Sequence, residues 1–247
     1  MRLHVGTDSL RGDIAAYARR FDMLELCAER GRLPRKARLA EMKRAVSENF
    51  LFSVRLPAAL STLEPSDEAE AGLAYAVEVA EVLGAELLVL QTPASVRPSA
   101  RTRKRLVELA SQLPSGRALA WEPRGLWQDE ESEIMAREMG ATLVRDVSRE
   151  PGPGGATLYT RLRALGRSGV SVDAIARTAE AALGATLACI VIEGDGAVAA
   201  AKRLRQMIVE AAAFAADEDE GEGEDEDEGE GEGEGEGEGE GEGEGEG

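Results

Sequence analysis

Polar side chains stand at strand ends in this sequence, at a spacing that could place them in one site. In the stretch 117–127, RALAWEPRGLW, two alanines and Glu122 share one face of a predicted strand, while Leu119 and Trp121 share the other. Pro123 ends the strand because it has no N–H to donate. Glu122 therefore lies where a strand meets a loop, which is where parallel α/β folds usually place their functional groups.

The inward rows of the other predicted strands end in polar groups in the same way. The full set is Glu25, Arg55, Gln91, Glu122, Asp146, Arg161 and Glu193. An unpaired buried charge is costly in free energy. Seven polar residues at strand ends are therefore not expected of a purely structural core. We expect Glu25, Glu122, Asp146, Arg161 and Glu193 to converge as a wet, ligand-ready mouth. The alternative is that these groups pair with one another, with Arg55 and Arg161 each binding a carboxylate.

These residue types suit acid–base chemistry or the binding of an anion. Glu25, Glu122 and Asp146 are the candidate catalytic residues, and Glu122 would act as a general acid or base if burial raised its pKa. The candidate ligand-binding residues supply donors and acceptors, and they are Thr7, Arg55, Gln91, Arg124, Arg161 and Glu193. Arginines suit a phosphate or carboxylate group. We expect a small polar or anionic ligand, and the sequence indicates no particular cofactor.

Metal binding is not the preferred interpretation. His4 is the only histidine, and it lies off the row formed by Leu3, Val5 and Thr7, so we expect it to pack structurally. Together with two widely separated cysteines, it argues against a zinc site. The mouth carboxylates suit Mg²⁺ or Mn²⁺, but the neighbouring arginines would compete for them, so we expect no metal. One poorly placed histidine also argues against a Ser/His/Asp or Cys/His arrangement.

Eight predicted strands alternate with helices along the chain. The strands are expected at 3–6, 23–27, 50–55, 86–91, 117–122, 142–146, 157–162 and 186–193. The helices are expected at 13–20, 35–47, 68–83, 99–113, 130–139, 171–183 and about 196–214, with no room for one at 151–155. Strict alternation predicts a parallel sheet, and eight units of this length favour a single α/β domain, a (β/α)8 TIM-type barrel. An open doubly wound sheet is the alternative.

The charge of the chain is concentrated in its last residues. The sequence has 247 residues with 47 acidic and 29 basic side chains, and 19 of the acidic ones lie in 217–247, which has no basic residue. Residues 1–216 therefore keep 28 acidic side chains against 29 basic ones, so bulk charge argues against a nucleic-acid partner. Gly-Glu alternation cannot bury a core, so we expect a barrel domain at 1–216 and a disordered acidic tail at 217–247.

The remaining composition points to a cytoplasmic protein without a membrane segment. No apolar targeting segment follows Met1, and no run approaches the ~20 apolar residues that a membrane span needs. Cys27 and Cys189 are the only cysteines, too few for a disulfide framework, which favours a reducing compartment.

The acidic tail is a candidate for contacts with basic surfaces, including one on this chain. The predicted helix at 99–113 begins with a basic cluster, namely Arg97, Arg101, Arg103, Lys104 and Arg105. Positive charge at a helix N-terminus is opposed by the helix dipole, so a nearby anion would relieve it. We hypothesise a loose, salt-sensitive contact between tail and helix, and the alternative is a tail that samples solvent freely.

Several short motifs, in this order along the chain, resemble the domain-of-unknown-function 72 family, also called YecE-like. They are Val5-Gly6-Thr7, LELCAERGRLP at 24–34, FSVRLP at 52–57, LQTPASV at 90–96, WEPRGLW at 121–127 and YTRLR at 159–163. The resemblance covers most of residues 3–210 and implies a TIM-barrel fold. The positions that match the family are Glu25, Gln91, Glu122, Arg124 and Arg161.

The chain also departs from the family pattern. Cys27 stands at the family's asparagine, Arg30-Gly31 at its Phe-Tyr pair, Gly125 at its histidine, and 192–194 at its late Phe-Asn-Asn. The aromatic and amide half of the family pocket is therefore absent, and the family implies no settled activity. We expect a divergent member that binds or acts on a small ligand at the strand C-terminal mouth. The alternative is an inactive scaffold whose acidic tail engages basic partners.

Overall fold

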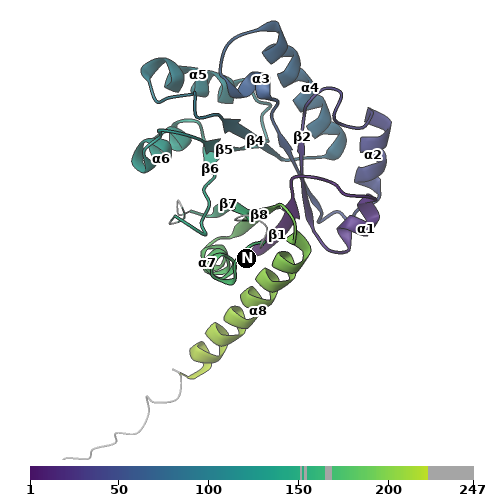
Figure 1. The fold of residues 1–247 in the computed structure, drawn as a ribbon, viewed down its shortest axis with the longest axis vertical. Coiled ribbons are helices and arrows are strands. Elements are labelled where there is room, and N and C mark those ends of the chain that lie inside the picture. Colours follow the sequence, from purple (N-terminus) through teal and green to yellow (C-terminus); the bar gives the residue numbers. More distant parts are fainter. Residues whose placement is uncertain (151, 153–154, 165–168, 222–247) are drawn as a thin grey trace, which may run out of the picture. The chain divides into compact units, whose positions relative to one another are not determined.

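The computed structural model describes residues 1–150, 152, 155–164 and 169–221, and it divides into two compact units, Met1–Ala212 and Ala213–Gly247. All strands of the first unit pair in parallel, in the order β6-β5-β4-β3-β2-β1-β8-β7, with helices around them (Figure 1). The strands are β1 (Arg2–Thr7), β2 (Met23–Cys27), β3 (Leu51–Arg55), β4 (Leu87–Thr92), β5 (Ala118–Pro123), β6 (Ala141–Leu143), β7 (Thr157–Arg163) and β8 (Leu187–Glu193). The helices are α1 (Ile14–Ala18), α2 (Lys36–Arg44), α3 (Ala58–Ser61), α4 (Asp67–Leu83), α5 (Ala100–Ser111), α6 (Asp129–Glu138), α7 (Val172–Leu183) and α8 (Ala197–Gly221).

The two ends of the strand order meet at a single point. An isolated parallel bridge joins Arg145, just past β6, to Thr160 in β7. The Thr160 hydroxyl donates to the Arg145 carbonyl at 2.7 Å and accepts from the Val147 N–H at 3.3 Å. The eight strands therefore form a nearly closed barrel, as expected, and not an open doubly wound sheet.

Strand alternation separates two apolar cores. Inside the barrel lie side chains from five strands together with Val144 just past β6, namely Met23, Leu87, Val89, Ala120, Val144, Tyr159, Cys189 and Val191. Between the strands and the helices lies a larger core that includes Leu119 and Trp121. The two faces predicted for the fifth strand are thus confirmed, with alanine inside and Leu/Trp under the helices.

Strand β1 turns the row of Leu3, Val5 and Thr7 toward the helices. Val5 belongs to the outer core, and His4 lies in register with the inward-facing Cys189. Gly6 lies on the same face as His4 by strand alternation, and a Cβ there would come 2.0 Å from the carbonyl oxygen of Met23. Only glycine permits this close approach of β1 to β2. The row ending in Thr7 consequently faces the helices.

Other elements differ from their expected bounds at the ends. Strand β6 stops at Leu143, three residues before the predicted end, because the chain bends away there and Asp146 forms a local turn with Ser148. Helix α2 is shorter than the predicted 35–47. It ends at Arg44, and the N–H of the capping residue Ala45 donates to the carbonyls of Glu41 and Met42. Two helices, α3 and α4, follow β3, and in the described part of the segment between β6 and β7 no helix forms.

The last helix is longer than expected. Helix α8 continues to Gly221 and so includes the first residues of the segment 217–247. The rest of the predicted disordered tail, 222–247, lies outside the described residues. Within the described residues, none of the helices combines the length and the apolar character that crossing a bilayer requires.

Candidate ligand site at the barrel mouth

The loop after β5 is held tightly and places Arg124 at the mouth. The N–H of Arg124 donates to the carbonyl of Thr92 at 3.1 Å, so the chain stays beside β4 for one residue past Pro123. Gly125 follows with φ +96°, and a Cβ there would lie 2.8 Å from the Cα of Ala94. The glycine at the family's histidine position is therefore required by this tight turn.

Trp127 fixes the far end of the same loop. Its indole N–H donates to the Val96 carbonyl at 3.0 Å, and its ring stacks edge-on against Trp121, with centroids 5.0 Å apart. Both tryptophans of the stretch therefore serve as packing that holds the loop. Arg124 and Glu122 are positioned by this rigid support.

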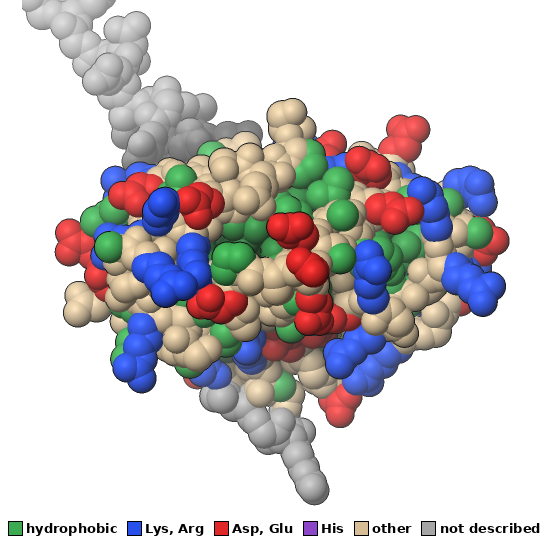
Figure 2. Space-filling model, turned by 90° about the horizontal axis from the view of Figure 1, so that it is seen from above, with side chains coloured by type: hydrophobic (Ala, Val, Ile, Leu, Met, Phe, Trp, Pro, Cys, Tyr) green, Lys and Arg blue, Asp and Glu red, His purple; other side chains and the backbone are tan. Residues whose placement is uncertain are grey.

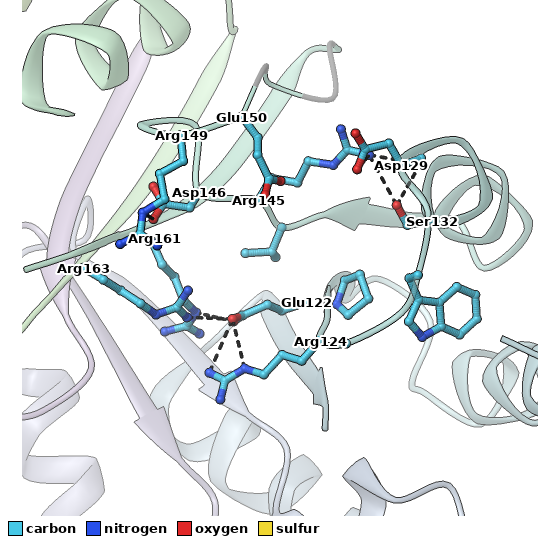
Figure 3. Close-up of a pocket in the computed structure, with 14 residues that line it drawn as sticks. Glu122, Arg124, Asp129, Ser132, Arg145, Asp146, Arg149, Glu150, Arg161 and Arg163 are labelled. Carbon is cyan, nitrogen blue, oxygen red and sulfur yellow. Dashed lines mark hydrogen bonds and ion pairs between the residues drawn. The ribbon is translucent and has the colours of Figure 1, made fainter. Parts of the chain in front are cut away.

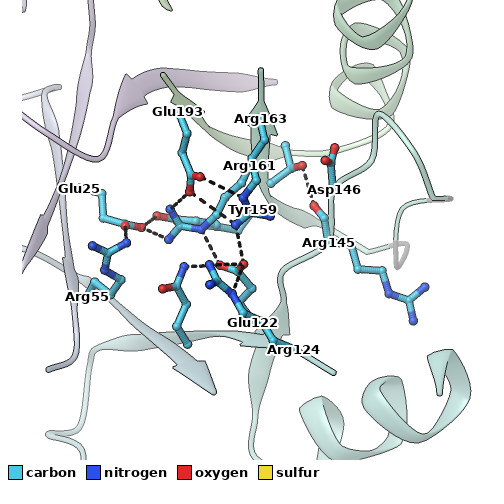
Figure 4. A network of polar contacts seen from close by, with 12 residues as sticks. Glu25, Arg55, Glu122, Arg124, Arg145, Asp146, Tyr159, Arg161, Arg163 and Glu193 are labelled. Carbon is cyan, nitrogen blue, oxygen red and sulfur yellow. Dashed lines mark hydrogen bonds and ion pairs between the residues drawn. The ribbon is translucent and has the colours of Figure 1, made fainter. Parts of the chain in front are cut away.

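Arg161 is the centre of the site, and three carboxylates surround it. Its Nε donates to Glu122 Oε2 at 2.6 Å, its Nη1 to Glu193 Oε1 at 3.1 Å, and its Nη2 to Glu25 Oε2 (Figure 4). The Arg161 side chain is 1 % exposed. Each guanidinium nitrogen already has a carboxylate partner, so Arg161 organises the mouth and is not available to a ligand.

Two further residues, Arg163 and Gln91, donate hydrogen bonds to the carboxylates of Glu122 and Glu193. Arg163 Nη2 donates to Glu122 Oε1 at 2.6 Å, and its Nε donates to Glu193 Oε2 at 2.9 Å. Gln91 Nε2 donates to Glu122 Oε2 at 2.7 Å. The two carboxylates are thus locked by donors from β4 and β7, which is typical of a preorganised site.

Glu25 lies deepest, inside the barrel. The Tyr159 hydroxyl donates to Glu25 Oε2 at 2.5 Å, and the Tyr159 oxygen lies 3.3 Å from Ser53 Oγ. Arg55 Nη1 lies 3.5 Å from Glu25 Oε1, and that oxygen has no hydrogen-bond partner among the described residues. The Glu25 carboxylate is fully buried and its outer oxygen is unsatisfied.

The pKa values of this cluster move away from neutral pH. Burial alone would raise the pKa of Glu122, but Arg161, the hydrogen bond from Gln91 and Arg163 lower it below its usual value. Burial and the charge of Glu25 raise the pKa of the Tyr159 hydroxyl well above its usual value. Glu122 is therefore a carboxylate near pH 7, and the raised pKa expected for a general acid is not found.

A cavity of about 470 Å³ opens beside this cluster, between the ends of β5, β6 and β7, and we call it the β5–β7 cavity. Its lining includes Glu122, Arg124, Asp146, Arg149, Arg161 and Arg163. Figure 3 shows Arg124 directed toward Glu122 on one side and Asp146 with Arg149 on the other. The size is typical of sites for small ligands.

Arg124 carries a charge that the cluster does not balance. Three carboxylates, Glu25, Glu122 and Glu193, face three guanidinium groups, those of Arg55, Arg161 and Arg163. Arg124 adds a further positive charge, and its side chain is 51 % exposed. Among the described residues its ionic contact is to Glu122, at 3.4 Å for both Nε and Nη2. This guanidinium can bind an anion in the cavity without leaving a strong partner.

Most of the predicted site residues meet at the mouth, but two do not join the cluster. Asp146 lines the β5–β7 cavity, yet its carboxylate accepts from Ser148 Oγ at 2.5 Å and pairs with Arg149. Asp146 thus lies at the same end of the barrel as Glu122 and Arg161, as predicted, but its carboxylate pairs locally because β6 ends before it and the strand alternation is lost. Thr7 lies in a different cavity, where its Oγ1 is 3.1 Å from the Tyr17 hydroxyl.

Two arginines were missed by the sequence reasoning. Arg163 lies on the same inward row as Tyr159 and Arg161, so extending β7 by one residue would have found it. Arg145 is 8 % exposed and lines the β5–β7 cavity, where it pairs with Asp129 and Glu133. No sequence signal marks Arg145, since it follows a strand of only three residues.

No group of three or more His, Cys, Asp or Glu side chains in the described residues is arranged to hold a metal ion. The carboxylates considered for Mg²⁺ or Mn²⁺ are directed at guanidinium groups instead, with Arg161 at the point where a cation would lie.

On the face shown in Figure 2, acidic and basic side chains are interspersed.

The comparison with known sequences decides the family. The family described as "Protein of unknown function DUF72" matches residues 5–221 of this chain. The chain belongs to this family. No curated protein sequence matches it. Glu25, Gln91, Glu122, Arg124 and Arg161, the residues on which the motif resemblance rests, lie together at the mouth and are linked by hydrogen bonds to Glu122 and Arg161.

Solved structures of DUF72 proteins share the fold. A DUF72 protein from Enterococcus faecalis V583 is 18 % identical with a TM-score of 0.66, over 85 % of this chain and 98 % of that one. A DUF72 protein from Thermotoga maritima MSB8 is 16 % identical with a TM-score of 0.66, over 86 % and 100 %. An L-ribulose 3-epimerase is 14 % identical with a TM-score of 0.61, over 92 % and 100 %. At these identities the likeness shows the barrel fold alone.

Proposed function

We propose that this DUF72 chain binds a small anionic ligand in the β5–β7 cavity, with Arg124 as the main contact to the anion. The observation that carries the proposal is the unbalanced guanidinium of Arg124, half exposed at the rim of a preorganised cluster. Arg149, which is 49 % exposed on the opposite wall, supplies a second donor. Arginine forks suit carboxylate and phosphate groups.

Binding is favoured over acid–base catalysis by these groups. A general acid or base works best with a pKa near the working pH. The pKa of Glu122 is lowered, and that of Tyr159 is raised well above its usual value. Each of these groups therefore holds its protonation state across neutral pH, which suits a fixed binding surface.

Calorimetric titration of the full chain at low ionic strength tests the proposal. We expect inorganic phosphate or pyrophosphate to bind, with affinity falling as salt rises. Arg124→Gln should weaken binding at least tenfold, because a charge-assisted hydrogen bond contributes about 1.5–3 kcal/mol.

Arg38→Gln is the matched control. Arg38 is 54 % exposed and pairs with Glu41 on α2, so its loss removes the same charge away from the cavity. Equal weakening by Arg124→Gln and Arg38→Gln would mean that only overall charge matters. If neither phosphate nor pyrophosphate binds, the proposal is rejected.

A further inference from the structure

A second cavity opens at the same end of the barrel. It has a volume of about 530 Å³ and lies over the ends of β2, β3 and β4, and we call it the β2–β4 cavity. Its lining includes Cys27, Arg55, Gln91, Thr92, Arg124 and Glu193. Arg124 lines both cavities, so the two spaces meet at the residue that we propose binds the anion.

The Arg161 cluster lies between the two cavities. Figure 4 shows Glu25 and Arg55 on one side of Arg161, and Arg145 and Asp146 on the other. The anion site and the β2–β4 cavity are thus neighbouring parts of one mouth. A ligand longer than a simple anion can occupy both.

Arg55 in the lining of the β2–β4 cavity pairs with a carboxylate that does not itself reach the cavity. Glu25 is fully buried, and its Oε1 has no hydrogen-bond partner among the described residues. Arg55 Nη1 lies 3.5 Å from this oxygen and lines the cavity with its side chain 22 % exposed. Arg55 therefore stands between the buried Glu25 carboxylate and the cavity, and its guanidinium presents hydrogen-bond donors to a ligand there.

The other lining groups fit hydroxyls. Arg55 is a donor, the Glu193 carboxylate is an acceptor, and the Gln91 amide offers both kinds of group. A hydroxyl donates one hydrogen bond and accepts others, so it can pair with each of these groups. A chain of several hydroxyls matches such alternating donors and acceptors better than an apolar or a purely anionic group does.

We infer that the ligand is a polyhydroxylated chain with one anionic end, with the anion on Arg124 and the hydroxyls in the β2–β4 cavity between Arg55, Gln91 and Glu193. This inference rests on the proposed anion site and names the class of molecule that the site takes. A polyol phosphate is the simplest member of the class. The anion supplies the charge contact, and the hydroxyls supply the selectivity.

Calorimetry with three probes tests this assignment on the full chain. Inorganic phosphate presents the anion alone, ribitol presents the hydroxyls alone, and ribitol 5-phosphate presents both. We expect ribitol 5-phosphate to bind at least tenfold more tightly than phosphate, and ribitol alone to bind most weakly. Arg55→Gln should remove most of that gain, whereas Arg38→Gln should leave the affinities for phosphate and for ribitol 5-phosphate unchanged.

The two natural cysteines allow a second readout, because their rates of chemical modification can be compared without introducing a new cysteine. Cys27 lines the β2–β4 cavity and is partly exposed, whereas Cys189 is fully buried inside the barrel. Iodoacetamide should therefore modify Cys27 in the folded chain and spare Cys189. Ribitol 5-phosphate should slow the modification of Cys27, and phosphate at equal occupancy should not.

The possible outcomes separate the two proposals. If phosphate and ribitol 5-phosphate bind equally and neither protects Cys27, the anion site stands and the polyol assignment is overturned. If ribitol binds as tightly as its phosphate, the role of Arg124 as anchor is overturned. If none of the three probes binds, both proposals fail together. Tighter binding with protection of Cys27 supports the assignment.

Discussion

A single guanidinium holds the mouth of this barrel together. Arg161 is almost fully buried and contacts three carboxylates, so its removal would leave three negative groups facing one another. Breaking a buried ion pair by removing one partner costs about 3–5 kcal/mol. The cluster is therefore the main electrostatic support of the ligand site.

Arg161→Met tests that role. We expect the free energy of unfolding to fall by at least about 3 kcal/mol, because Glu25, Glu122 and Glu193 would lose their shared partner. Urea unfolding followed by the fluorescence of the buried Trp121 measures it. Arg163→Met is the control, since Arg163 is 33 % exposed and should cost clearly less. Equal losses of stability in the two variants would show that Arg161 does not support the cluster more than Arg163 does.

The lowered pKa of Glu122 predicts a dependence of stability on pH. A carboxyl whose pKa is lower in the folded state stabilises the fold above its unfolded pKa of about 4.3. This stabilisation is lost as the pH falls through the lower folded value. Glu122→Gln should therefore be less stable than the original chain at pH 7, and the difference should shrink between pH 5 and pH 3. A difference that stays constant over this range would contradict the shift.

At the scale of elements, the contact between β1 and β2 depends on Gly6. A Cβ at Gly6 would lie 2.0 Å from the Met23 carbonyl oxygen, so one strand must shift. We expect Gly6→Ala to destabilise the chain by about 1–3 kcal/mol, in line with other overpacked sites. Thermal unfolding measures this loss. Gly184→Ala is the control, because its Cβ would meet only an ordinary contact at 3.7 Å. Similar melting temperatures for the two variants would refute the close approach.

Strand alternation explains how much of the site the sequence could predict. Six of the seven predicted strand ends, all except Asp146, are in the cluster or in direct contact with it, because each follows a regular inward row. The rule fails where a strand is irregular. Strand β6 has three residues, so Asp146 leaves the row, and Thr7 of β1 lies beside Tyr17 in a different cavity. Pairing between neighbouring charges, which sets the pKa of Glu122, depends on side-chain positions that no periodicity contains.

At the scale of the whole molecule, the barrel is weakest between β6 and β7. These strands share one isolated bridge, whereas β4 pairs with β5 over six residues. Strand edges without a full ladder open more easily than paired ones. The alternation of strands and helices in the sequence predicted the fold class. It could not predict the weak pairing between β6 and β7, because that depends on how many residues of β6 pair with a neighbour.

Hydrogen exchange measures the gap directly. We expect amides of β6 to exchange at least tenfold faster than those of β4 in the full chain under native conditions. The central strand has partners on both sides, and the short edge strand has a regular partner only in β5. Equal protection of the two strands would show that the barrel closes more completely than the single bridge indicates.

The central claim is that Arg124 at the β5–β7 cavity binds an anion, and a crystal structure grown with selenate at low ionic strength tests it most directly. Selenate imitates phosphate or sulfate, and its anomalous signal locates the ion independently of the surrounding density. The account predicts a selenium peak within hydrogen-bond distance of the Arg124 guanidinium, on the side facing Arg149. A fully occupied selenate elsewhere on the chain, with none at Arg124, would contradict it.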